Sequence, residues 1–297
     1  MRQIEAQKIT DTVSRLCQEA NFFLPEDVIF SLRNALEKEE STLGKEVLSQ
    51  MLKNAEIAAK EAIPICQDTG MAIVLLDIGQ EVEIVDGDPS TEFIPSDAEG
   101  LRTSLTAAIN EGIRKGYREG YLRKSVVEDP LFTRQNTGDN TPGVIHIQEV
   151  PGDSLRVAVF IKGGGSEGVG RAEVLKPADG AHGVKSFVLR TVEEAGANPC
   201  PPTVVGVGCG GTLDYAALLA KKALLRPLGT FNSDTKIAGL ERELLERIND
   251  LGIGPAGLGG RISSLAVHIE TYPSHIATLP VAVDVGCYAL RRKEATL

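Results

Sequence analysis

Residues 63–78 read IPICQDTGMAIVLLDI, and in this stretch the chain changes from helices to a mixed pattern of strands and helices. The helix before it is expected to stop ahead of Pro64, because proline disfavours the helical conformation of the preceding residue. The run MAIVLLDI has the length and apolar character of a buried strand. The CQDTG segment between them is therefore predicted to be a loop at an element boundary, where functional groups are often held.

The residues before this stretch are predicted to be helical. Apolar residues at helical spacing indicate three helices, which begin near the N-terminus, near Pro25 and at Thr42. The first ten residues are interpreted as the start of the first helix. The third helix is expected to end at Ala62.

Downstream of this stretch, strands and helices are predicted to alternate. Two strand-like runs, 144–150 and 155–161, flank the turn Pro151-Gly152-Asp153 and indicate a hairpin. The acidic residues 80–100 are expected to form a surface excursion. The remaining predicted helices lie at 101–117, 184–192, 214–225 and 236–251, and the remaining strands at 204–207, 264–269 and 279–285.

All 297 residues are predicted to form a single α+β domain. It consists of a helix-rich N-terminal lobe, residues 1–62, packed on a mixed sheet within an α/β core of residues 63–297. A chain of this length buries a sizeable core without disulfide bonds.

The composition excludes several classes of protein. The net charge of −10, from 31 Lys and Arg against 41 Asp and Glu, argues against a nucleic-acid or anionic-membrane surface. No apolar run approaches the roughly 18 residues of a membrane span, and the N-terminus lacks the apolar region of a signal peptide. We therefore expect a cytoplasmic protein. Its five cysteines, an odd number, argue against a disulfide framework.

Three of these cysteines, Cys66, Cys200 and Cys287, lie in turns beside predicted elements. They are either three unrelated thiols or the ligands of one metal cluster. Structural zinc sites carry closely paired cysteines such as CxxC, which this sequence lacks. Three widely spaced thiolates suit an iron–sulfur cluster with one open iron, whereas most electron-transfer clusters use four cysteines.

Seven motifs follow one another along the chain: ICQDTG at 65–70, LRKSVVEDP at 122–130, NTGDNTP at 136–142, KGGGSE at 162–167, CPP at 200–202, GGT at 210–212 and GCYALRR at 286–292. Together they resemble those of the iron–sulfur hydro-lyase family, the class I fumarate hydratases and L-tartrate dehydratases, from about residue 5 onward. The resemblance implies a class I fumarase α-type catalytic domain with a [4Fe-4S] cluster held by Cys66, Cys200 and Cys287. It also implies a separate β subunit, because the sequence resembles the α subunit alone.

Members of this family add water reversibly to a C=C bond beside a carboxylate. Arg123 is the candidate for holding a substrate carboxylate, because its planar fork donates two hydrogen bonds. The resemblance assigns Gln67 and Gly164 to substrate binding, Asp68 to proton relay, and His275 to a catalytic histidine. The proton-abstracting base is expected in the β subunit, so the chain alone is predicted to be inactive.

The sequence leaves more than one function open. The first is hydration of fumarate to (S)-malate, and its close alternative is dehydration of L-tartrate to oxaloacetate. A remote alternative is a non-catalytic anion- or nucleotide-binding module that uses the loops GGGSE and GVGCGGT, although neither matches an established phosphate-binding motif. An electron-transfer cluster needs a fourth thiolate, for which Cys209 is available, but Cys209 is interpreted as a buried thiol.

Overall fold

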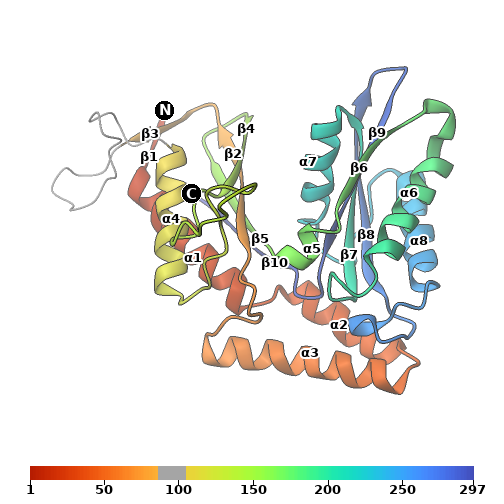
Figure 1. Cartoon of the computed structure of the whole chain (residues 1–297). Helices are drawn as coiled ribbons and strands as arrows, with labels where there is room; N and C mark the ends of the chain where they lie inside the picture. Colours follow the sequence, from red (N-terminus) through yellow and green to blue (C-terminus); the bar gives the residue numbers. More distant parts are fainter. Residues whose placement is uncertain (86–104) are drawn as a thin grey trace. The chain divides into compact units, whose positions relative to one another are not determined.

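The computed structural model describes residues 1–85 and 105–297, and the chain forms two compact units (Figure 1). Unit 1 comprises Met1–Leu24, Ile57–Gly163 and Arg291–Leu297, and unit 2 comprises Pro25–Glu56 and Gly164–Leu290. Each unit is therefore built from segments far apart in the sequence. This division does not coincide with the predicted boundary at residue 62, and the expectation of a single domain stays a prediction.

Unit 1 contains a four-stranded sheet in the order β10-β5-β2-β4. The strand predicted from the apolar run is β2 (Met71–Gly79), which pairs antiparallel with β5 (Leu155–Lys162) and parallel with β4 (Val144–Val150). The other edge of β5 pairs antiparallel with β10 (Arg291–Thr296). Residues 72–76 of β2 are all buried, so both faces of this strand are covered.

The predicted hairpin of residues 144–150 and 155–161 is wrong. Both strands are present, but β2 lies between them, and β4 and β5 do not pair with each other. A turn between two strand-like runs shows that the chain reverses its direction, but it does not show which strands pair. Here the most apolar strand takes the position between them, where its residues are buried on both faces.

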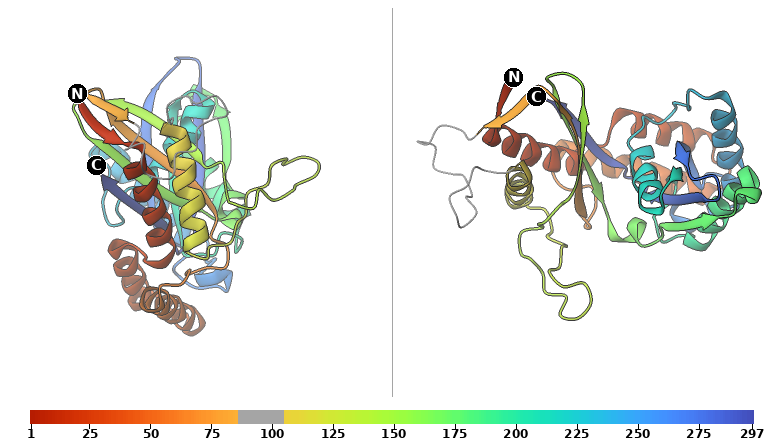
Figure 2. Two further views of the ribbon diagram at one scale, coloured as in Figure 1. Left: turned by 90° about the vertical axis from the view of Figure 1, so that its left-hand side faces the viewer. Right: turned by 90° about the horizontal axis from the view of Figure 1, so that it is seen from above.

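Two helices cover this sheet, α1 (Ala6–Phe22) and α4 (Leu105–Glu119), and they lie side by side (Figure 2). Helix α1 also packs against β5 and β10. Ile9, Val13 and Leu16, which share one face by their spacing, are fully buried, as the periodicity predicts.

The N-terminal residues differ from the prediction in one respect. Arg2–Glu5 form a short strand, β1, which pairs in parallel with β3 (Val82–Val85), where the sequence predicts the start of a helix. At the start of a helix the first backbone N–H groups have no partner within the helix, whereas in β1 the pairing with β3 supplies hydrogen-bond partners. Ile4 of β1 is also buried. The predicted surface excursion thus contains a strand, and its remainder from residue 86 lies outside the described residues. So do residues 101–104 of the helix that α4 otherwise confirms.

Unit 2 contains a second four-stranded sheet, in the order β6-β9-β7-β8. β7 (Thr203–Gly211) pairs antiparallel with β9 (Leu279–Gly286) and parallel with β8 (Ser264–Ser274). The other edge of β9 pairs with β6 (Arg171–Leu175). The sequence predicts β7, β8 and β9 in shorter form, whereas β6 and β10 are additional strands.

Helices cover both faces of this second sheet (Figure 1). α6 (Gly180–Ala195) and α8 (Thr235–Asn249) enclose the larger apolar core with alternate residues of β7 and β9. α7 (Leu213–Ala223) lies on the other face. There Gly208 carries no side chain, and a Cβ at this position would clash with the carbonyl oxygen of Ala216, so glycine permits the close approach of helix and strand.

The three predicted N-terminal helices are all present, and they are divided between the two units. α1 belongs to unit 1, α2 (Glu26–Lys38) contacts β8 in unit 2, and the division falls within α3 (Thr42–Glu61). Helical periodicity identifies an apolar face, but it does not identify the sheet that this face covers. The α+β class is confirmed. None of the described helices has the length and apolar character needed to cross a membrane.

Candidate functional site

One end of the unit 1 sheet gathers three segments that are far apart in the sequence. Met71 at the start of β2 pairs with Lys162 at the end of β5, and Arg291 at the start of β10 pairs with the residue before Lys162. The Cys66–Gly70 loop leads into β2, and Gly163 follows β5. The register of the sheet therefore places this loop, Gly163 and Arg291 at the same end.

Within the loop, Cys66 and Gln67 are exposed and Asp68 is half-buried. The carboxylate Oδ1 of Asp68 accepts a hydrogen bond from the backbone N–H of Gly70 at 2.9 Å. This is the turn geometry for which aspartate is favoured. It fixes the carboxylate relative to the backbone that carries Cys66 and Gln67.

Arg123 is joined to the same loop. Its carbonyl oxygen accepts a hydrogen bond from Oγ1 of Thr69 at 2.7 Å, and the residue itself is exposed. The hydroxyl of Tyr117 donates to the carbonyl oxygen of Thr69 at 2.6 Å, and burial raises the pKa of this phenol far above its usual range, so it stays a donor. Unit 1 thus brings together four predicted site residues, Cys66, Gln67, Asp68 and Arg123.

The motifs LRKSVVEDP and NTGDNTP meet at Asn140, a buried residue to which the sequence assigns no role. Its Oδ1 accepts from the backbone N–H of Ser125 at 2.7 Å, and its Nδ2 donates to the carbonyl oxygen of Gly70 at 3.2 Å. Asn140 therefore connects the segment of Arg123 to the Cys66–Gly70 loop. Asn140 lies within the NTGDNTP motif, so this motif is the sequence signal that could have identified it.

Arg291 is a second residue that sequence reasoning missed. It is only 2% exposed, and its Nη1 donates to the carbonyl oxygen of Asp68 at 2.6 Å and to Oδ1 of Asn21 at 3.0 Å. The GCYALRR motif contains it, but arginine pairs in a sequence are typical of surfaces. Its burial follows from tertiary structure alone.

In unit 2, Cys200 and Cys287 lie at one end of the sheet. β7 begins three residues after Cys200 and β9 ends directly before Cys287, and the antiparallel pairing of Val204 with Gly286 puts these strand ends side by side. The backbone N–H of Tyr288 donates to the carbonyl oxygen of Cys200 at 3.3 Å. Unit 2 therefore brings together the loops of two of the three predicted ligands.

The backbone at Cys200 has an unusual conformation. Its φ of 53° lies in the left-handed region, which few residues other than glycine adopt, and its N–H donates to the carbonyl oxygen of Ala197 at 3.0 Å. The hydroxyl of Tyr288 in turn accepts from Nδ2 of Asn54 at 3.3 Å. Backbone strain of this kind concentrates at functional sites.

The cysteines differ in their suitability as metal ligands. Burial raises the pKa of Cys17 and of Cys209 to about 12, so both stay protonated thiols at neutral pH. Metal ligation needs the thiolate. Cys66 and Cys200 are exposed and Cys287 is half-buried, so all three predicted ligands are accessible.

Convergence of the three thiols stays a prediction. Over residues 1–85 and 105–297, no group of three or more His, Cys, Asp or Glu side chains is arranged to hold a metal ion. Cys66 belongs to unit 1, whereas Cys200 and Cys287 belong to unit 2.

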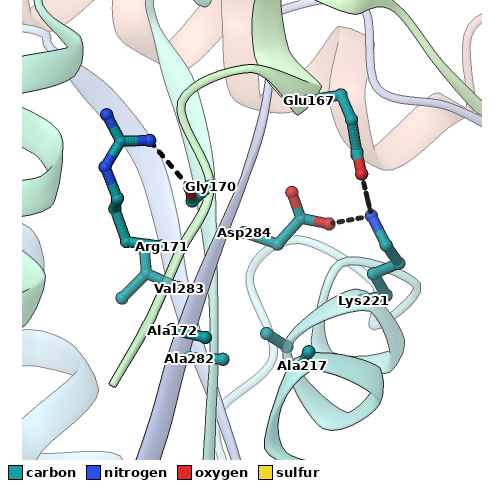
Figure 3. A pocket seen from close by; sticks show the side chains of 10 residues that line it. Glu167, Gly170, Arg171, Ala172, Ala217, Lys221, Ala282, Val283 and Asp284 are labelled. Carbon is teal, nitrogen blue, oxygen red and sulfur yellow. Dashed lines mark hydrogen bonds and ion pairs between the residues drawn. The ribbon is translucent and has the colours of Figure 1, made fainter. Parts of the chain in front are cut away.

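The predicted substrate-binding residue Gly164 opens a short helix, α5 (Gly164–Glu167), in unit 2. Glu167 lines a cavity of about 200 Å³ (Figure 3), where Nζ of Lys221 lies 2.7 Å from its carboxylate and 3.1 Å from that of Asp284. Burial lowers the pKa of Lys221, but the two carboxylates outweigh burial and hold this pKa above its usual range. The charged network ties α5 to β9.

His275 lies at the opposite end of the unit 2 sheet from Cys287. It follows β8 in the exposed connection to β9, whereas Cys287 follows the far end of β9. Eight strand residues at about 3.3 Å each span about 26 Å. Within unit 2 the structure therefore does not bring His275 to the end that holds Cys200 and Cys287.

Comparisons with known proteins agree with one another. Residues 10–296 match the family model described as fumarate hydratase (Fumerase). A chain of Methanocaldococcus jannaschii, provisionally named L(+)-tartrate dehydratase subunit alpha, is 44% identical over 290 residues, which cover 96% of both chains. The L(+)-tartrate dehydratase subunits alpha of Escherichia coli and Shigella sonnei are 35% and 34% identical over 293 residues, or 98% of this chain and 91% of theirs.

Proposed function

The chain belongs to the fumarate hydratase (Fumerase) family of hydro-lyases, and from this premise we propose that it is the α subunit of a two-subunit enzyme that dehydrates L-tartrate to oxaloacetate. The names of its relatives support this substrate. The order of preference predicted from the sequence is thereby reversed. Hydration of fumarate to (S)-malate is the second candidate, favoured by the description of the family. Membership of a hydro-lyase family leaves the non-catalytic binding module without support.

We assign Cys66, Cys200 and Cys287 as the ligands of a [4Fe-4S] cluster. Their accessibility supports the assignment, and so does the raised pKa of Cys17 and Cys209, which disfavours a fourth thiolate from either. When bound, such a cluster supplies an open iron that acts as a Lewis acid on the substrate hydroxyl.

The observation that carries the proposal is the hydrogen bond from Thr69 to Arg123, because it joins two motifs of the family in one cluster of loops. The guanidinium of Arg123 would donate two parallel hydrogen bonds to a substrate carboxylate. Gln67 would bind a second substrate oxygen through its amide. Asp68, held by the N–H of Gly70, would carry a proton between the substrate and solvent.

The other predicted roles depend on the resemblance. Gly164 is proposed to donate its backbone N–H to an anionic substrate oxygen, since glycine places no side chain in the way. A separate β subunit is proposed to supply the base and the remaining catalytic residues, and the designation of the relatives as alpha subunits supports such a partner. The catalytic role of His275 stays a prediction, and its position within unit 2, at the other end of β9 from Cys287, does not support that role.

Anaerobic reconstitution tests this proposal. The chain is loaded with iron and sulfide in the presence of thiol, combined with its cognate β subunit, and assayed with L-tartrate and with fumarate. We expect a brown protein with a higher kcat/KM for L-tartrate, inactivated in air and restored by ferrous iron and thiol. A colourless protein, or full activity of this chain alone, contradicts the proposal, and a preference for fumarate selects the second candidate.

A further inference from the structure

Arg291 holds the backbone of the loop that carries Asp68. Its guanidinium is buried at the first position of β10, and Nη1 is shared between the carbonyl oxygen of Asp68 and Oδ1 of Asn21. Asn21 is itself fully buried, and its own carbonyl oxygen accepts from the N–H of Ile65, directly before Cys66. A buried guanidinium is costly unless its N–H groups find acceptors. Nη1 of Arg291 finds these two, whereas its buried Nε finds none among the described residues, so the attachment to Asp68 and Asn21 depends on Nη1.

Gly163 leaves the space that the carboxylate of Asp68 occupies. A Cβ at this position would lie 2.9 Å from Oδ2 of Asp68 and 3.3 Å from Nη2 of Arg291, closer than such atoms normally approach. The φ of Gly163 lies outside the left-handed region, so the backbone accepts any residue. Glycine is therefore required here by space and not by conformation.

We infer that Gly163 and Arg291 are positioning residues that fix Asp68, an inference that rests on the proposed function. Arg291 holds the carbonyl group of Asp68, the N–H of Gly70 holds Oδ1, and the bare Cα of Gly163 leaves room for Oδ2. Gly163, the first glycine of the GGG motif, thus leaves room for the Asp68 side chain, whereas Gly164, the second, is proposed to bind the substrate. Proton transfer depends steeply on such placement, and a 1 Å displacement costs roughly 100-fold in rate.

The variant Gly163→Ala separates positioning from folding. The atom that the new methyl group meets first is the end of a side chain, which can move without disturbing the backbone. The matched control is Gly239→Ala in α8, an exposed position where a Cβ meets nothing within 4 Å. Arg291→Met removes both hydrogen bonds, and Arg291→Lys keeps the charge and a single donor nitrogen on a shorter side chain.

The first measurement is hydrogen exchange of the full chain without cluster. We expect Gly163→Ala to lower the protection of the Gly70 amide at least tenfold while core amides of β5 and β7 keep theirs. The second is steady-state kinetics of the reconstituted complex with the β subunit. There we expect Gly163→Ala to lower kcat about 100-fold with KM within threefold of wild type, and Arg291→Lys to recover part of the kcat lost in Arg291→Met.

The inference is overturned if Gly163→Ala keeps both the protection of Gly70 and the kcat of wild type. It is also overturned if protection falls equally at all core amides, which would indicate a general structural role. Should Arg291→Met fail to fold, Gly163→Ala still decides. An inactive wild-type complex contradicts the proposed function alone, since the exchange measurement uses neither cluster nor substrate.

Discussion

The backbone N–H of Tyr288 donates a hydrogen bond to the carbonyl oxygen of Cys200, over 3.3 Å, across 88 residues of sequence. Cys200 lies three residues before β7 and Tyr288 lies two residues past the end of β9, and these two strands pair antiparallel. The pairing of β7 with β9 therefore holds the loops of Cys200 and Cys287 next to each other.

Serine substitution of each proposed ligand should abolish cluster assembly. We expect Cys66→Ser, Cys200→Ser and Cys287→Ser each to retain less than a tenth of the wild-type iron after reconstitution, because a hydroxyl is a poor substitute for a thiolate. Iron and sulfide content per chain are the measurements. Cys209→Ser is the control and should keep its cluster, and loss of iron in that variant would instead make Cys209 a ligand.

The thiols of the apo chain should differ in their rate of alkylation. With a pKa of about 12, Cys17 and Cys209 are thiolates in only about one molecule in ten thousand at pH 8, so they should resist iodoacetamide while Cys66 and Cys200 react. Mass spectrometry of digested peptides gives the labelling at each site. Rapid labelling of Cys209 under native conditions would contradict the raised pKa of its thiol.

Arg123→Lys should weaken substrate binding although it keeps the positive charge. A lysine cannot form two parallel hydrogen bonds with a carboxylate, and a lost charged hydrogen bond of about 1.5–3 kcal/mol corresponds to a KM at least tenfold higher. Steady-state kinetics of the complex with the β subunit measures this. Arg118→Lys, at an exposed position of α4, is the matched control, and equal KM values for both variants would remove Arg123 from the site.

The ion network at the unit 2 cavity should stabilise the chain up to high pH. Lys221→Met leaves the largely buried carboxylate of Asp284 without this partner, which should cost about 3 kcal/mol in the free energy of unfolding. Because the folded-state pKa of Lys221 is raised, the stability it contributes is complete below the unfolded pKa of about 10.4 and is lost as pH rises through the folded pKa. Urea unfolding of wild type and variant should therefore differ at pH 8, and the difference should shrink in strongly alkaline buffer. A constant difference across this range would contradict the assignment.

His275→Ala should leave the cluster content unchanged, since the length of β9, about 26 Å, separates the sheet end near His275 from the sheet end near Cys287. Iron content and kcat are measured together on the reconstituted complex. A kcat within threefold of wild type would remove His275 from catalysis. A loss of about 100-fold with intact cluster would retain it.

Much of the fold follows from local patterns in the sequence. Two local patterns each predict an element that the structure contains: the helical periodicity of Ile9, Val13 and Leu16, and the apolar run at 71–78. These predictions succeed because the apolar residues that form each pattern are the ones that the element buries. Pairing is different, since it depends on distant segments. β2 lies between β4 and β5, and β1 pairs with β3, but the sequences of these strands do not predict which strands they pair with.

The site shows the same limit. The motifs predict Gln67, Asp68 and Arg123 from the sequence, and the hydrogen bond between Thr69 and Arg123, 54 residues apart, shows that two of these motifs meet. Arg291 could not be found in this way, because the sequence does not show whether an arginine side chain is buried or exposed. Its role depends on the register of β10 against β5, which only the folded sheet specifies.

The strand β10 also has a consequence for biosynthesis. It completes the edge of the unit 1 sheet, yet it leaves the ribosome only after all of unit 2 has been translated. Until then β5 has no partner on that edge and the Asp68 loop lacks its arginine, so we expect incomplete unit 1 to be prone to aggregation during synthesis. Expression at low temperature, with affinity tags kept away from Leu297, whose backbone pairs with Leu155, should favour recovery of the native chain.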